Sequence, residues 1–202
     1  ELWDALERTL VVRDTHLVQH RVDFRLLEPG ARLDGADDGL THVTFVDWER
    51  GRYLDLLHRS RWSSGSRLEK KLARALAAEL LQAHAGWEDP WPEPELETFR
   101  YQTADGSIAI LPYSDGDLKL SALVADLAPE RFDRAALALY FRRVLEDEGE
   151  SRDRKAMAIY GLAGLGEPVL LAAHQLLAEP ELTPVEQLYA MLAAAALGDL
   201  EA

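Results

Sequence analysis

The 202-residue chain contains no cysteine, and this absence removes several chemistries at once. Disulfide bonds, thiolate metal sites and a cysteine nucleophile all need a sulfur that the chain does not have. Long apolar runs are also missing. Even the alanine-rich run Met191–Leu197 is far shorter than the roughly 20 residues that a membrane-spanning helix needs. We therefore expect no membrane insertion within this chain.

Positive charge is scarce. The chain has 22 lysine and arginine residues against 36 aspartate and glutamate residues, a formal net charge of −14. Proteins that bind nucleic acid neutralise its phosphates with lysine and arginine, so we do not expect this acidic chain to bind nucleic acid. The basic residues between Arg59 and Arg74 are interleaved with leucines, which is typical of the solvated face of a helix.

Patterns that hold a metal ion or another cofactor are also missing. His16 and His20 lie in a predicted strand, where four residues span about 13 Å, too far for both to bind one ion. Asp34, Asp37 and Asp38 lack the spacing and the distal glutamate of a calcium loop. No His-x-x-x-His pattern falls in a predicted helix. The sequence therefore predicts no cofactor and no metal site.

Residues 1–48 are predicted to form a short helix and a small β-hairpin. Leucines recur at helical spacing within residues 1–10. Apolar and polar residues then alternate over residues 18–26 and again over 42–45, as expected for two half-buried strands. The segment Glu28-Pro29-Gly30 starts the turn between them.

Helical periodicity begins near Glu49, so residues 49–202 are predicted to form a helix-hairpin domain. Two helices precede a proline-rich segment and five follow it. The five are expected to begin near Asp117, Asp133, Ser151 or Asp153, Pro168 and Thr183. The fold class is therefore mainly α: an antiparallel helix-hairpin array, a partial α/α-toroid or solenoid, with a small N-terminal β-hairpin. The third and fifth of these helices are dense in alanine, so we expect them to be inner helices, covered on both sides.

Two local motifs are expected around the second helix and after the proline-rich segment. Ser66 and Glu69 have the spacing of a capping box, and Gly86 is expected to end the helix that they begin. Asp105-Gly106 lies between short apolar runs, which predicts a hairpin or a tight loop.

Aromatic and acidic residues in the loops are the candidates for ligand binding. Trp87 and Trp91, with the acids around them, suit a platform for stacking a sugar ring. The alternative is that the tryptophans hold a proline-rich loop against the helices. Asp105, Tyr113 and Asp115 are further candidates, although Asp115 is also well placed to cap a helix.

One family resemblance rests on three segments. The segment from Leu56 to Glu69 leads through Gly65-Ser66 into a long helix, and the stretches 101–106 and 112–122 contain a Gln, an Asp-Gly loop and a serine-aspartate cap before an inner helix. Together they resemble the thioester domain of bacterial alpha-2-macroglobulins and complement-like proteins. The resemblance extends over about Gly51 to Gly198. It implies the α/α-toroid that this domain shares with terpenoid cyclases and prenyltransferases.

The chain departs from that family at its reactive residues. Ser66 stands where the family has its thioester cysteine, and Leu68 and Glu69 stand where it has a Glu-Gln pair. A thioester needs a cysteine thiol and a glutamine amide, so the resemblance implies a relative that cannot bind its targets covalently. Ser66 could act as a substitute nucleophile. An N-cap explains both Ser66 and Glu69 more simply.

The sequence thus predicts a non-catalytic binding or scaffolding module, with a protein or a glycan as partner. The chain begins at Glu1 and carries no signal sequence, and we interpret it as a piece of a larger, exported bacterial protein located outside the cell or at its surface. The alternative is a toroid enzyme that processes glycans with carboxylates near Trp87 and Trp91.

Overall fold

The computed structural model describes residues 21, 23, 25–43, 45, 48–88 and 96–200. The chain divides into two compact units, residues 1–55 and 56–202. The sequence placed its division at 48/49. The structural boundary falls inside helix α1 (Trp48–Arg61), which was predicted to begin near Glu49.

The predicted N-terminal β-hairpin is not seen. Residues 25–43 contain no strand, and all of them are exposed. Alternating residues hold a strand in register only where one face is buried, and this segment buries none. The turn at Glu28-Pro29-Gly30 is present, with Ala31 N–H donating to the Glu28 carbonyl at 3.0 Å. The predicted helix at 1–10 and most of the first predicted strand lie outside the described residues.

Helix α2 (Leu68–Ala85) ends at Gly86 as predicted, with a left-handed φ of 61°. The predicted capping box is wrong. The N-cap is Arg67, whose side chain makes no capping bond, and the Leu68 N–H instead donates to the Ile110 carbonyl at 2.9 Å. The Glu69 carboxylate bonds to the Arg67 side chain. The first amide of α2 is therefore capped by Ile110, from a distant loop, and not by Ser66 as the Ser66–Glu69 spacing predicted.

Helix α2 buries opposite faces at its two ends. Leu68 and Leu72 are buried in the main core, whereas Ala77 and Leu81 are buried outside that cluster. At about 100° per residue, Leu81 points to roughly the opposite side of the axis from Leu68. Leu80 points between these two directions and is exposed.

Residues 98–117 form a compact loop over the start of α3 (Leu118–Leu127). The loop begins with the 3₁₀ turn η1 (Thr98–Tyr101) and contains two isolated bridges, one from Gln102 to Ile108 and one from Ala109 to Gly116. Asp105-Gly106 makes a tight loop, one of the two predicted forms, with Gly106 at a φ of +91°.

The remaining elements are the 3₁₀ turn η2 and four helices: η2 (Pro129–Arg131), α4 (Arg134–Glu146), α5 (Arg152–Gly164), α6 (Leu170–Leu177) and α7 (Pro184–Ala196). Three of the predicted helix starts, Asp117, Asp133 and Thr183, are confirmed as N-caps, because each side chain accepts at least one hydrogen bond from the first turn of its helix. Helix α6 begins after Pro168 rather than with it. The Glu167 N–H still donates to the Leu162 carbonyl and completes the end of α5.

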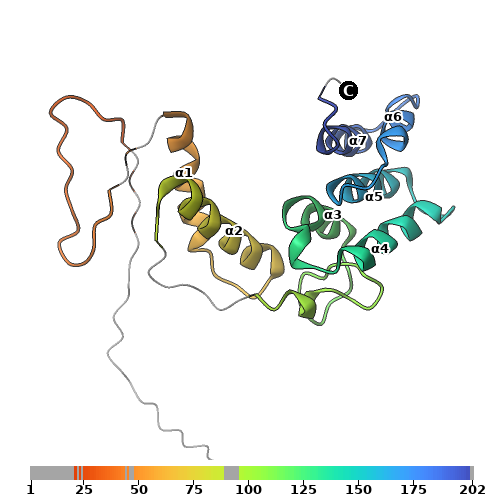
Figure 1. The fold of residues 1–202 in the computed structure, drawn as a ribbon, viewed down its shortest axis with the longest axis horizontal. Helices are drawn as coiled ribbons and strands as arrows, with labels where there is room; N and C mark the ends of the chain where they lie inside the picture. The colour runs from red at the N-terminus through yellow and green to blue at the C-terminus, as the bar shows by residue number, and fades with distance from the viewer. Residues whose placement is uncertain are drawn as a thin grey trace, which may run out of the picture. The chain divides into compact units, whose positions relative to one another are not determined.

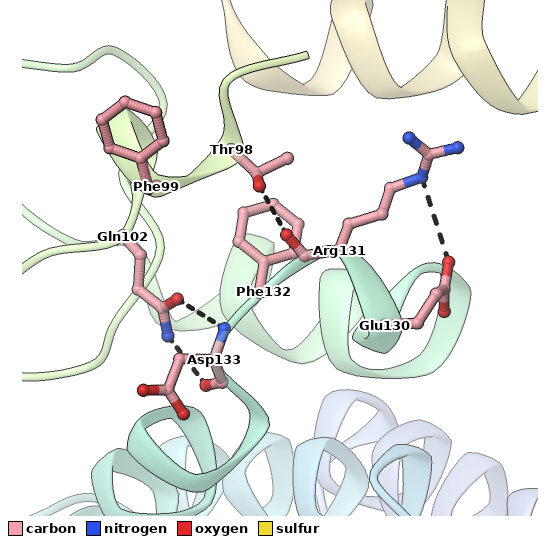
Figure 2. Close-up of a pocket in the computed structure, with 7 residues that line it drawn as sticks. All are labelled: Thr98, Phe99, Gln102, Glu130, Arg131, Phe132 and Asp133. Atoms are coloured by element: carbon pink, nitrogen blue, oxygen red, sulfur yellow. Dashed lines mark hydrogen bonds and ion pairs between the residues drawn. The ribbon is translucent and has the colours of Figure 1, made fainter. Parts of the chain in front are cut away.

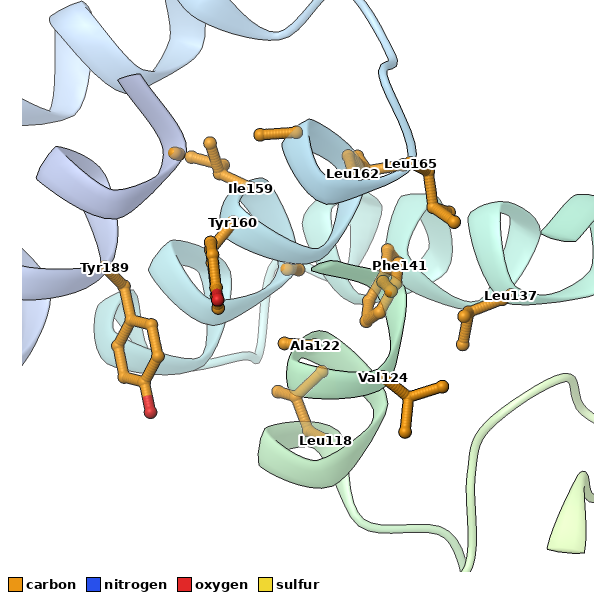
Figure 3. Packing of buried hydrophobic residues seen from close by; sticks show 14 of the residues in the cluster. Leu118, Ala122, Val124, Leu137, Phe141, Ile159, Tyr160, Leu162, Leu165 and Tyr189 are labelled. Carbon is orange, nitrogen blue, oxygen red and sulfur yellow. The ribbon is translucent and has the colours of Figure 1, made fainter. Parts of the chain in front are cut away.

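Helices α3 to α7 pack together as a helical array, which confirms the mainly α part of the predicted fold (Figure 1). Helix α5 contacts all four of the others and is buried on nearly every side. Tyr160 of α5 contacts both α3 and α7. Its hydroxyl donates to Asp126 of α3 at 2.8 Å, and its ring lies 5.8 Å from that of Tyr189 of α7 (Figure 3). Helix α5 is therefore the inner helix that its alanine content predicted.

Helix α7 is not covered on both sides. It packs on α5 and α6 with one face, and its other face is exposed. None of the described helices is long and apolar enough to cross a bilayer.

Candidate functional site

Trp87 lies directly after α2 and is only 8% exposed. The Arg61 guanidinium lies 6.0 Å from its ring centroid, and the His58 ring meets it edge-on at 5.8 Å. Little of the Trp87 ring is therefore accessible to a ligand, and its contacts fit the interpretation in which it holds the chain against the helices. Trp91, the other half of the proposed sugar platform, lies outside the described residues.

Asp105 holds the tight loop together. Its Oδ1 accepts hydrogen bonds from the Ser107 hydroxyl at 2.7 Å and from the Ser107 N–H at 3.0 Å, and the Thr103 hydroxyl also bonds to it. Burial alone would raise the pKa of Asp105, but these hydrogen bonds, with the nearby charge of Arg143, outweigh it and lower that pKa. The carboxylate stays ionised and is engaged within its own loop.

Tyr113 and Asp115 lie in the same loop as Asp105 and are exposed, Tyr113 at 84%. The loop beneath them is fixed to its neighbours. Ile108 N–H donates to the buried Ser121 hydroxyl at 2.8 Å, and Asp117 N–H donates to the Ile108 carbonyl at 2.8 Å. The structure thus brings three of the predicted binding residues onto one well-anchored loop. Asp115 does not cap α3, because Asp117 has that role.

A shallow pocket of about 200 Å³ lies between η1 and η2 (Figure 2). It is lined by Thr98, Phe99, Gln102, Glu130, Arg131, Phe132 and Asp133. This pocket was not predicted, because its two walls come from segments far apart in the chain.

Most polar groups of the pocket walls are already paired. The Gln102 amide donates to the Asp133 carbonyl at 3.0 Å and accepts from the Asp133 N–H at 2.9 Å. The Thr98 hydroxyl bonds to the Arg131 carbonyl, and the Arg131 guanidinium bonds to Glu79 of α2 (Figure 2 shows the first of these). The pocket therefore offers chiefly the exposed ring of Phe99 and the half-buried ring of Phe132.

Acid–base chemistry has little support at this pocket. A glycosidase needs two available carboxylates on either side of its substrate. The Asp133 carboxylate caps α4 by accepting from Ala135 and Ala136 N–H at 3.0 Å each. Among the described residues, no group of three His, Asp or Glu side chains could hold a metal ion.

The most distinctive surface of the described array is the open face of α7. We define the α7 face as Val185, Leu188, Met191, Leu192, Ala195 and Ala196, which are all exposed. On the opposite side Tyr189, Ala190, Ala193 and Ala194 are buried. Gln187 is the one polar side chain on the exposed half of this helix. A helix that is apolar all round is normally buried, so this face is built for contact with another apolar surface.

The one charged side chain of α7 points inward. Glu186 is buried, and its Oε1 accepts from Arg152 Nε of α5 at 2.8 Å. Its Oε2 accepts from the Thr183 N–H at 2.8 Å, which completes a capping box. The hydrogen bond from Arg152 is the main cause of the lowered pKa of Glu186, with the Thr183 backbone next. The α7 face therefore carries no charge.

Comparison of the chain with protein-family models, with curated proteins and with solved structures gives no match. The functional argument accordingly rests on the surfaces described above.

Proposed function

We propose that this chain is a non-catalytic helical-repeat module that binds a protein partner through the α7 face. The observation that carries the proposal is an exposed, uncharged helix surface in a chain in which 29% of residues are charged. Apolar surface of this kind is stabilised when it is removed from water, at about 25 cal/mol per Å². The engaged carboxylates of Asp105 and Asp133 also favour binding over catalysis.

We further propose a relationship to the thioester domains that the sequence resembles, without their reaction. Without a cysteine the chain cannot form a thioester. Ser66, which stands at the corresponding position, is exposed, and its carbonyl accepts a hydrogen bond from the Tyr101 hydroxyl at 3.0 Å. In this proposal the module belongs to an exported or surface-located protein and retains the helical scaffold for binding.

Cross-linking in cells tests the proposed function. The wild type, a Leu188→Glu/Leu192→Glu variant of the α7 face and a Leu171→Glu control would be expressed with the same tag and treated with a lysine-reactive reagent. Leu171 is exposed on α6, outside the α7 face, so its substitution adds a glutamate at a different place. We expect a cross-linked protein partner with the wild type and the control, and its loss with the α7-face variant.

Partners that cross-link equally to all three proteins would contradict the proposal. Turnover of a polysaccharide by the purified chain would also contradict it, and would favour the glycan-processing alternative.

A further inference from the structure

We propose that the partner of the α7 face is the same face of a second copy, paired antiparallel across a two-fold axis. This inference rests on the proposed function and names its partner. A surface without charge is matched best by another surface without charge, because an unpaired charge buried against it would lose its hydration. The α7 face of a second copy is such an uncharged surface, in a chain that is otherwise strongly acidic.

The spacing along α7 suits pairing with a second helix. Val185, Leu188, Leu192 and Ala195 are separated by three, four and three residues, the spacing of the a and d positions of a coiled coil. In an antiparallel pair centred on Ala190, Leu188 lies opposite Leu192 of the second copy. Val185 then lies opposite Ala195, whose small side chain allows the helices to approach closely.

The α7 end of the described array is more apolar than its α3 end. Beyond α3, the loop 98–117 covers the first turn, where Leu118 and Leu120 are buried in one cluster with Tyr101 and Ile108. The exposed residues of α3 also include charged ones, Lys119 and Asp126. Head-to-tail stacking of α7 on α3 would bury those charges, whereas pairing of two α7 ends gives a closed dimer.

Helix α7 is held in place before any partner binds. The capping box at Thr183 and the pairing of Glu186 with Arg152 fix its first turn, and the Tyr160–Tyr189 contact fixes its middle. Little ordering entropy is therefore lost on pairing. The contact is small, since one helix per copy contributes less than the roughly 800 Å² per partner of a standard interface. We expect a dissociation constant on the order of 10 µM.

The acidic residues at the ends of α7 add a salt dependence. Glu179, Glu181 and Asp199 flank the helix, so antiparallel pairing brings acids of the two copies near each other. Like charges repel less as ionic strength rises, because the screening length falls from about 10 Å at 0.1 M to about 3 Å at 1 M. The dimer is therefore expected to become tighter in high salt.

Sedimentation equilibrium of the purified 202-residue chain tests the proposal. We expect a monomer–dimer equilibrium that Leu188→Glu weakens by at least about tenfold, equivalent to 1.4 kcal/mol, and that Leu171→Glu leaves unchanged. Circular dichroism confirms that each variant is folded. A chain that stays monomeric well above the expected dissociation constant would overturn the inference, as would a dimer that Leu188→Glu does not affect.

Single cysteines test the antiparallel arrangement, because the chain has none of its own. A mixture of Leu188→Cys and Leu192→Cys proteins is expected to form a mixed disulfide faster than either protein alone, while Leu171→Cys is expected to stay reduced. Faster cross-linking of Leu188→Cys with itself would overturn the antiparallel pairing. A monomeric purified chain that still shows an α7-dependent partner in cells would reject the second copy and leave the proposed function standing.

Discussion

Helices α5 and α7 have similar alanine-rich sequences but different surroundings. Helix α5 is enclosed by α3, α4, α6 and α7, whereas α7 is enclosed on one side and exposed on the other. Both helices have Ala and Tyr where they pack, and both pair a charged residue of their first turn with the other helix. The comparison shows that composition indicates which helices can be buried, while the neighbours present decide which of them are.

The largest effect that separates the two helices should come from matched leucine truncations. Leu162 of α5 is 2% exposed, and Leu188 of α7 is 54% exposed. We expect Leu162→Ala to lower the free energy of unfolding by about 3 kcal/mol, because it leaves a cavity in the core. Leu188→Ala should change it by less than about 0.5 kcal/mol in dilute protein. Urea unfolding measures both, and equal effects would mean that α7 is as enclosed as α5.

A smaller effect is expected where α5 meets α4. Alanine normally stabilises a helix interior relative to glycine by up to about 1 kcal/mol. At Gly161, however, a Cβ atom would lie 2.4 Å from Cζ of Phe141. We expect Gly161→Ala to destabilise the protein by about 1–2 kcal/mol, because over-packing outweighs the gain in propensity.

A double-mutant cycle checks this cause. In a Phe141→Leu background the ring is gone, so the added cost of Gly161→Ala should shrink or change sign. An unchanged cost would show that the close approach of Phe141 to Gly161 is not the reason that glycine is needed there.

The smallest effect should appear in the acid limb of the stability curve. The folded-state pKa of Glu186 is lowered mainly by its hydrogen bond from Arg152. This carboxylate therefore contributes stability above its unfolded pKa of about 4.3, which is lost as the pH falls through the lower folded value. Arg152→Lys keeps the charge but loses the second contact, from the guanidinium to the Glu181 carbonyl at 3.0 Å.

We therefore expect the pKa of Glu186 to return toward its ordinary value in Arg152→Lys. The variant should therefore be slightly less stable than the wild type at neutral pH, and the difference should shrink as the pH falls below about 4. Thermal melts between about pH 3 and pH 7 measure the difference. A difference in stability that is the same at pH 7 and at pH 3 would show that the α5–α7 ion pair is not its cause.

The sequence predicted those parts of the fold that depend on neighbouring residues. The caps Asp117, Asp133 and Thr183 were found because a cap and the amides it binds lie within one helical turn. The cap at Ser66 was wrong because Ile110, from a distant loop, bonds to the first amide of α2. The hairpin was wrong because alternation alone provides no buried face.

The candidate site was predicted less well, for the same reason. The loop with Asp105, Tyr113 and Asp115 could be identified from its turn residues. The pocket beside it could not, because it depends on the pairing of Gln102 with the backbone of Asp133. The open side of α7 was also missed, since its sequence predicts burial on every side.

The two oppositely facing contacts of α2 have a mechanical consequence. A helix that is buried on one side only can rotate about its long axis and bury a neighbouring row of side chains instead. In α2, a rotation that changed the packing of Leu68 and Leu72 would also move Ala77 and Leu81 out of their buried positions. A rotation of α2 about its axis, in either direction, would therefore expose apolar surface at one end of the helix or the other.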